Sequence, residues 1–165
     1  MPPTAAPALV RRLACMLYEG VLLFGVLMLS GLLYGTVTQQ RHALVGTHGL
    51  QVFVFVVLGV YFVTFWSRGG QTLAMKTWHV RLLTRSGGPV TVPRAIARYL
   101  ASWMWCLPAL AIVGASGWHG STAVALALGA NAGLMLLLAR LQPTRQFVHD
   151  RLCGTALVDT RGARL

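Results

Sequence analysis

The chain has 165 residues, of which 56% are hydrophobic and only 10% are charged, and its mean hydropathy is +0.65. This composition excludes an ordinary soluble domain, in which about a quarter of the residues are charged, and it predicts an integral membrane protein. A net charge of +11 would fit a nucleic-acid-binding protein. However, the basic residues lie in loops between apolar stretches, so we expect no nucleic acid partner.

The first apolar stretch, residues 13–34, is long enough to span a bilayer and directly follows Arg11 and Arg12. A cleaved signal peptide is the alternative interpretation, because basic residues also precede an apolar run in such peptides. The stretch is longer than a signal sequence requires, carries Glu19, and has no small-residue cleavage pattern close behind it. We therefore expect it to persist as the first span.

Residues 50–66 form the second predicted span, which would be about 25 Å long as a helix and slightly short for the bilayer core. Tyr61 and Trp66 could support its ends at the interface. In the following loop, 67–98, the segment GGQTLAMKTW predicts a short interfacial helix with Leu73, Met75 and Trp78 facing inward and Lys76 outward. The alternation in HVRLLT then predicts a strand, closed by a turn at SGGP.

Residues 99–114 and 121–141 are the third and fourth predicted spans. Pro108 is expected to kink the third and to free a carbonyl group, because proline has no backbone N–H. In the fourth, GANAG places Gly129 and Gly133 four residues apart with Asn131 between them, a pattern typical of close helix packing. We expect it to serve packing within the bundle, with a homo-oligomer face as the alternative.

The tail, residues 142–165, contains PTRQFVHDRLCG, which predicts a short helix between a proline and a glycine. Asp150 would fall in its last turn, where an acid opposes the helix dipole, so a pairing with an arginine is expected. Arg145, Arg151 or an arginine of the loop 67–98 could be the partner, in a structural clamp. GTALVDTRG then alternates like HVRLLT, and the two predict a small sheet, the alternative being two irregular polar loops.

The basic residues divide unequally between the two sides of a four-span protein. Arg41 alone falls in a loop on one side, whereas thirteen fall on the other. By the positive-inside rule, both termini and the loop 67–98 are predicted to be cytoplasmic, in a bacterial-type inner membrane. The thirteen are Arg11, Arg12, Arg68, Lys76, Arg81, Arg85, Arg94, Arg98, Arg140, Arg145, Arg151, Arg161 and Arg164.

Glu19 is the least expected residue of the first span, because an unpaired carboxylate inside a bilayer is costly. Arg12 lies seven residues earlier on the same helix face, about 10 Å away along the axis, which is too far for easy contact. Arg98, at the cytoplasmic start of the third span, is therefore the better candidate partner. A buried pair that orients two helices and a cation or proton site both stay open as interpretations.

Other chemistry is not supported by the sequence. The five histidines are scattered without ligand spacing, so we expect no metal site and no cofactor. Cys15, Cys106 and Cys153 form no CxxC pair and are expected to stay reduced and packed. No phosphate-binding loop and no Ser/His/Asp set is present in the sequence, which argues against an enzyme.

RRLACMLYE at 11–19, GGQTLAMKTWHVRLLTRSGGPV at 69–90 and RQFVHDRLCGTALV at 145–158 together resemble the RDD family of small membrane proteins. The family is named for an arginine and two aspartates. The resemblance places these on Arg12, Glu19 and Asp150, with glutamate in place of the usual first aspartate. Ala74 also stands where the loop motif usually has glycine. Transport of ligands has been suggested for the family.

The sequence thus predicts an all-α integral membrane protein: one domain, 1–165, with a four-helix transmembrane bundle and a small cytoplasmic cap that includes a short sheet. One functional hypothesis is a small transporter or ion-exchange unit that uses Glu19 with arginine partners. The other is a scaffold or accessory subunit in which Arg12, Glu19, Arg98 and Asp150 only fix helix packing. Besides the bilayer, the expected partners are an ion or small molecule and, since four spans are few for a pathway, further copies or a partner protein.

Overall fold

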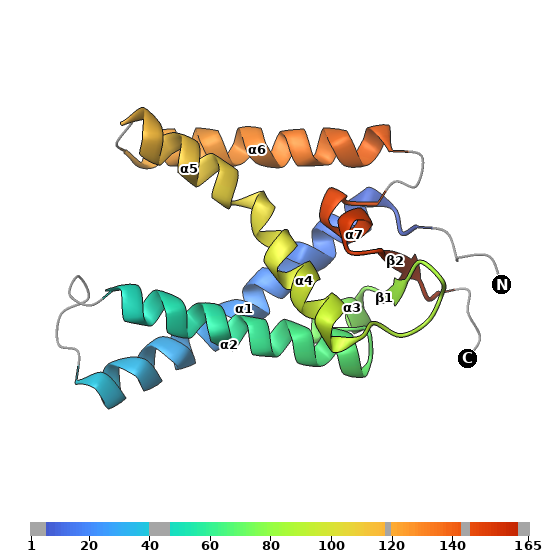
Figure 1. The fold of residues 1–165 in the computed structure, drawn as a ribbon, viewed down its shortest axis with the longest axis horizontal. Helices are drawn as coiled ribbons and strands as arrows, with labels where there is room; N and C mark the ends of the chain where they lie inside the picture. The colour runs from blue at the N-terminus through green and yellow to red at the C-terminus, as the bar shows by residue number, and fades with distance from the viewer. Residues whose placement is uncertain (1–5, 40–46, 118–119, 143–145, 162–165) are drawn as a thin grey trace.

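The computed structural model describes residues 6–39, 47–117, 120–142 and 146–161 (Figure 1). Within these ranges, three helices are long and apolar enough to cross a membrane: α1 (Leu9–Thr38), α2 (Thr47–Arg68) and α6 (Ser121–Leu141). A bent pair would supply a fourth span, by length and composition. It consists of α4 (Val92–Ser102), which continues into the 3-10 helix η1 (Trp103–Trp105), and α5 (Leu107–Ser116). The predictions made for Arg41, Arg145 and Arg164 lie outside the described residues.

The third predicted span is longer and more sharply broken than the sequence indicates. Its helix begins at Val92 instead of residue 99, and α5 turns away from α4 and η1 by 43°. Pro108 stands in the first turn of α5 and cannot donate to the carbonyl of Met104. The Asn131 amide of α6 donates to that carbonyl at 3.1 Å and to the carbonyl of Trp105 at 2.7 Å. The predicted kink is confirmed, and a side chain satisfies the freed carbonyl.

Because of this bend, the long helices are arranged differently from the predicted bundle. Figure 1 shows α1 and α2 side by side and α4 crossing the middle of the molecule, while the α5–α6 hairpin stands apart from α1 and α2. Accordingly, α6 packs against α5 and η1, whereas α2 packs against α1 and α4. The long apolar helices are therefore present, but they do not form one closely packed four-helix bundle, because the bend carries α5 away from α2.

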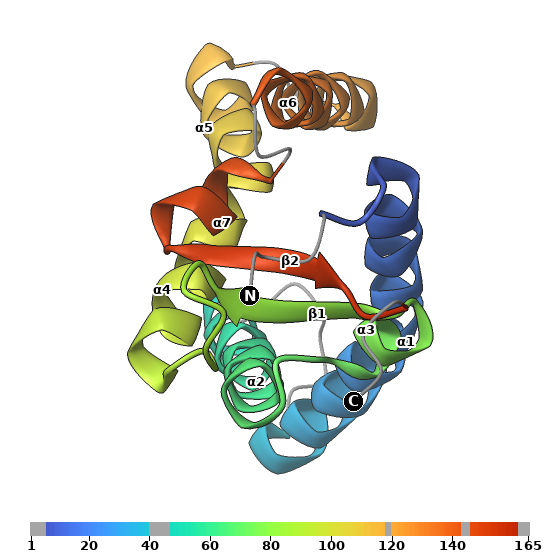
Figure 2. The same ribbon diagram turned by 90° about the vertical axis from the view of Figure 1, so that its right-hand side faces the viewer.

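The predicted pairing of HVRLLT with GTALVDT is confirmed. Strand β1 (Val80–Thr84) and strand β2 (Thr155–Asp159) form a two-stranded antiparallel sheet in which Leu82 lies opposite Leu157. Val80, Leu82 and Thr84 are buried and alternate with less buried residues, as the period-two pattern predicts. Figure 2 shows the sheet crossing one end of the molecule between α1 and α4.

Both outer edges of this small sheet are occupied by neighbouring groups. On the β1 side, the Leu82 N–H donates to the carbonyl of Gly70 at 2.7 Å. On the β2 side, the Gln146 side chain donates to the carbonyl of Leu157 at 3.0 Å and accepts from its N–H at 3.1 Å. A two-stranded ribbon is marginal by itself. These edge contacts join it to the chain on both sides.

Two short helices complete this end of the molecule. Helix α3 (Leu73–Thr77) follows α2 at the predicted place, with Met75 buried as expected. Leu73 differs from the prediction, because it is 55% exposed and does not face the interior. Helix α7 (Val148–Leu152) precedes β2 and carries Asp150. The sheet, α3 and α7 together form what we call the cap.

Candidate functional site

Glu19 occupies the junction of α1 with α2 and α3. Its side chain is 8% exposed, and its carboxylate accepts hydrogen bonds from the hydroxyls of Tyr61 on α2, at 2.7 Å, and Thr72. Thr72 is also the N-cap of α3, where its hydroxyl accepts from the Met75 N–H at 3.3 Å. The carboxylate thus joins three elements through neutral donors.

The expected direct ion pair between Glu19 and Arg98 does not occur in the described part of the chain. Arg98, on α4, instead donates through Nε to Oδ1 of Asp150 at 2.8 Å, and its Nη2 lies 2.7 Å from the same oxygen in an ion pair. Asp150 is fully buried, and α7 lies directly against α4. Asp150 is therefore the nearer acid. The prediction that Asp150 pairs with an arginine is confirmed, with Arg98 of the loop 67–98 as the partner, whereas a direct pair between Arg98 and Glu19 is not present among the described residues.

The Arg98–Asp150 pair is enclosed by aromatic and polar side chains. The Arg98 guanidinium carbon lies 4.1 Å from the centre of the Trp66 ring, an arrangement that favours a cation on the ring face. His149 Nε2 lies 3.5 Å from Asp150 Oδ1, and the Trp105 indole N–H donates to His149 Nδ1 at 3.4 Å. This pair connects the cap to α4, and its role as a structural clamp stays a prediction.

Arg12 is the fourth buried charged residue in the described part of the chain, and it has the fewest hydrogen-bond partners. It is 3% exposed, and its guanidinium carbon lies 4.7 Å from the centre of the Phe147 ring. Its Nε and Nη1 atoms are buried without a hydrogen-bond partner, and so is Oδ2 of Asp150. Buried polar groups without partners are uncommon in folded proteins. The arginine and the two acids of the family motif thus lie at one place. Within the described residues, two donors of Arg12 and one acceptor of Asp150 remain without a partner.

These side chains surround a cavity of about 300 Å³, which we call the Glu19 cavity. It lies where α1, α2 and α4 meet the cap, so Glu19, Arg12 and Arg98 share one enclosure without direct contact among them. Whether one water molecule connects Glu19 to either arginine stays a prediction. Its lining includes Arg12, Glu19, Arg98 and His149 together with apolar side chains such as Met16, Phe62, Trp66 and Phe147.

His149 is held neutral by its surroundings. Its pKa is lowered to about 4, mainly by burial; Asp150 opposes the shift and Arg98 adds to it. The ring therefore carries no charge at neutral pH and offers one N–H to the Asp150 side. Over the described ranges, no three His, Cys, Asp or Glu side chains gather into a group that could hold a metal ion.

This burial of His149 predicts a pH-dependent stability. The unfolded chain protonates His149 near pH 6.5, whereas the folded chain does so only near pH 4. The unfolded state therefore binds more protons between these values, and stability falls as the pH drops through that window. We expect a loss of roughly 2 kcal/mol between pH 7 and pH 5 in detergent-based unfolding measurements.

The matched control for this pH effect is a second histidine outside the cavity. His149→Gln should flatten the dependence over this range, and His48→Gln, at an exposed position on α2, should leave it as in the parent. Equal slopes for the parent and His149→Gln would show that another group causes the effect.

The small-residue pattern of α6 functions differently from the prediction. Asn131 binds the carbonyls at the break before α5, but the Cβ positions of Gly129 and Gly133 meet nothing within 4 Å in the described structure. Residues two apart on a helix point to nearly opposite sides. Since Asn131 faces η1, both glycines face away from it. The intrachain contact predicted for them is therefore wrong, and the homo-oligomer face stays a prediction.

Sequence reasoning missed several contributors to this site. Tyr61 and Trp66 look like interfacial anchors of a short span, and Thr72 looks like a loop residue. Only the structure shows that these side chains contact Glu19 or Arg98. A threonine three residues before Met75, at a predicted helix start, does carry a capping signal. That signal could have indicated where Thr72 lies, but not that it meets Glu19.

Comparison with known proteins gives one positive result. The model of the RDD family matches residues 6–154, which is most of the chain and includes Arg12, Glu19, Arg98 and Asp150. No curated protein and no solved structure matches significantly. A match over this share of the sequence is sufficient to assign the family, and it agrees with the three segments that converge on the Glu19 cavity. The chain therefore belongs to the RDD family.

Proposed function

We propose that this protein is a small ion-exchange or transport unit of the membrane, not an enzyme, and that Glu19 is its cation- or proton-binding group. The observation that carries the proposal is the environment of the Glu19 carboxylate. It lines the cavity of about 300 Å³ and accepts only from two hydroxyls, with no guanidinium in contact among the described residues.

The chemistry of this arrangement favours an exchangeable positive charge. A buried carboxylate needs compensation, and neutral hydroxyl donors supply only part of it. Carboxylate and hydroxyl oxygens together are hard ligands, which suit a proton or an alkali cation better than a soft metal ion. Arg12 and Arg98 in the same lining would then set how strongly such an ion is held, by repulsion across the cavity.

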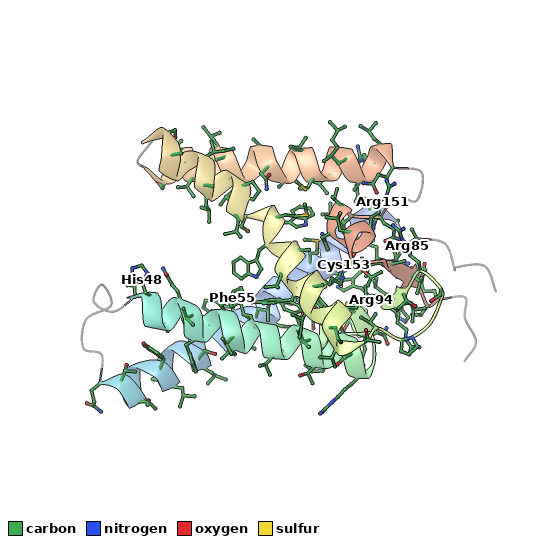
Figure 3. All side chains as sticks on the ribbon, in the orientation of Figure 1. His48, Phe55, Arg85, Arg94, Arg151 and Cys153 are labelled. Atoms are coloured by element: carbon green, nitrogen blue, oxygen red, sulfur yellow. The ribbon has the colours of Figure 1, made fainter. Side chains whose placement is uncertain are left out.

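The proposed orientation places the Glu19 cavity toward the cytoplasm. It supposes four spans, the bent pair counting as one, with both termini cytoplasmic in an inner membrane. Basic side chains gather accordingly: Figure 3 shows Arg85, Arg94 and Arg151 at the end of the molecule that carries the cap, and His48 at the opposite end. Because four spans are few for a complete pathway, the proposal includes a homo-oligomer or a partner membrane protein.

Ion flux into proteoliposomes tests this function. The purified parent should dissipate an imposed proton gradient on addition of Na⁺, K⁺ or Li⁺, measured with an entrapped pH-sensitive dye. Glu19→Gln should reduce this flux to the level of empty liposomes while the protein still folds and accumulates. Glu19→Asp, which restores the family's usual acid, should retain it.

Asp159→Asn is the matched control, because Asp159 is an acid of β2 outside the cavity lining and is paired with Arg11. It should conduct like the parent. Equal flux in Glu19→Gln and the parent, or no flux in the parent above empty liposomes, would contradict the proposal.

The second hypothesis, a scaffold or accessory subunit, also has a specific observation in its favour. Glu19 connects α1 to α2 through Tyr61 and to α3 through Thr72, so it contributes to assembly whatever else it does. Tyr61→Phe removes one of these connections and keeps the acid. A scaffold role predicts loss of stability in both Tyr61→Phe and Glu19→Gln without any flux in the parent.

A further inference from the structure

A second cavity, of about 390 Å³, lies between the beginning of α1 and the end of α6. We call it the Arg12–Arg140 cavity. It is separate from the Glu19 cavity, although Arg12 contributes to both linings. Its lining consists of Ala6, Pro7, Ala8, Leu9, Arg12, Ala139 and Arg140.

The beginning of α1 offers unused hydrogen-bond donors to this cavity. The first backbone N–H groups of a helix have no partner within the helix, and they carry a partial positive charge. The N-cap residue is Ala8, which makes no side-chain cap, and the first turn contains no acidic residue. Nothing in the first turn of α1 therefore neutralises this helix end, in contrast to α3, whose N-cap Thr72 accepts from Met75.

Arg12 adds a buried cation that lacks an acceptor. It is 3% exposed, and among the described residues its Nε and Nη1 atoms have no hydrogen-bond partner. One face of its guanidinium is covered by Phe147. Guanidinium N–H groups point outward in the plane of the group, and this geometry suits an acceptor with several oxygens. An unpaired buried cation is unfavourable, and an anion beside it would remove that penalty.

Arg140 brings a second positive side chain to the same lining. It stands in the last turn of α6, where it also offsets the partial negative charge of that helix end. Two arginines and a helix beginning are the donors that proteins commonly use for phosphate. We infer that the Arg12–Arg140 cavity binds a phosphate-bearing anion.

The location of this cavity leaves two sources for the phosphate group. If α1 and α6 cross the membrane as proposed above, their cytoplasmic ends lie at the level of the lipid headgroups, so an anionic phospholipid could supply it. A soluble phosphate compound could supply the same chemistry from the cytoplasm. The inference concerns binding at a cavity other than the Glu19 cavity, and it can succeed or fail independently of ion flux.

Thermal unfolding of purified, delipidated protein in neutral detergent tests this site. Short-chain phosphatidylglycerol and inorganic phosphate are titrated separately at constant ionic strength. At least one should raise the Tm in a saturable manner. Arg140→Gln should weaken the apparent affinity about tenfold, as expected for the loss of one charge-assisted contact. Arg140 is the primary variant because it is exposed, so its replacement should leave the fold intact.

Arg68→Gln is the matched control, because Arg68 is likewise an exposed arginine in the last turn of a long apolar helix, and it lies outside this lining. It should bind like the parent. Arg12→Lys keeps the charge but not the planar set of donors and should weaken binding if it folds. A response to both anions supports a site for phosphate itself, and a response to the lipid alone supports the headgroup. No saturable response to either, or equal losses in Arg140→Gln and Arg68→Gln, would overturn the inference.

Discussion

Asp150→Ala is expected to lower the free energy of unfolding by about 3–5 kcal/mol, because it removes the counter-charge of a buried arginine. Asp150 is fully buried and accepts a hydrogen bond from Arg98 within a close ion pair, and Arg98 is itself buried. Without the acid, Arg98 would keep its charge between Trp66 and α7 with nothing to offset it. Equilibrium unfolding in mixed detergent micelles measures the loss.

Two further variants test whether the loss of stability comes from breaking this buried ion pair. Arg98→Met in the Asp150→Ala background should recover much of the stability, because an apolar side chain of similar length needs no counter-charge. Asp159→Ala breaks the pair with Arg11 at the surface, where Asp159 is a third exposed, and should cost about 1 kcal/mol or less. A small effect of Asp150→Ala, or no recovery in the double variant, would show that the pair does not hold the cap.

Gly70→Ala is expected to cost about 3 kcal/mol, through backbone strain and a steric clash together. Gly70 has a φ of +67°, which disfavours any residue with a Cβ. An added Cβ would also lie 2.5 Å from the carbonyl oxygen of Leu82. That approach is close because the Gly70 carbonyl accepts from the Leu82 N–H, so the substitution would push β1 away from the end of α2.

The neighbouring glycine supplies the control. A Cβ on Gly69 would meet only the carbonyl of Phe65, at 4.0 Å, and its φ is not positive. Gly69→Ala should therefore change the unfolding free energy by less than about 1 kcal/mol. Comparable losses in the two variants would mean that the position of Gly70 between α2 and β1 is not the cause.

The elements that depend on local patterns could be predicted from the sequence. The apolar stretches fix where the long helices lie, and alternation in HVRLLT and GTALVDT identifies two strands that pair in the expected order. Pro108 likewise identifies the break, because its effect on helix hydrogen bonding is local. The arginine partner of Asp150 was predicted from a place in the last turn of a helix, but α7 has Asp150 in its first turn, so the pairing is right although that reason for it is wrong.

The partners within the site depend on how helices turn and tilt, which periodicity does not give. Arg98 lines the same cavity as Glu19, but the position of α7 brings Asp150 into contact with Arg98. The bend before α5 is 43° and directs the α5–α6 hairpin away from α2, an outcome that Pro108 alone does not specify. Tyr61 and Thr72 reach Glu19 from two other elements, and no spacing in the sequence indicates that they do.

The Thr72 hydroxyl has only one proton, so a change in the charge of Glu19 would also affect the start of α3. That proton is donated to the carboxylate, while the same oxygen holds the N–H of Met75. If Glu19 gains a proton or a cation, the carboxylate becomes a poorer acceptor, and the Thr72 hydroxyl is free to rotate. The start of α3 would then loosen, and α3 leads directly into β1. If Glu19 binds a proton or a cation as proposed, its charge state would therefore be coupled to the cap through Thr72.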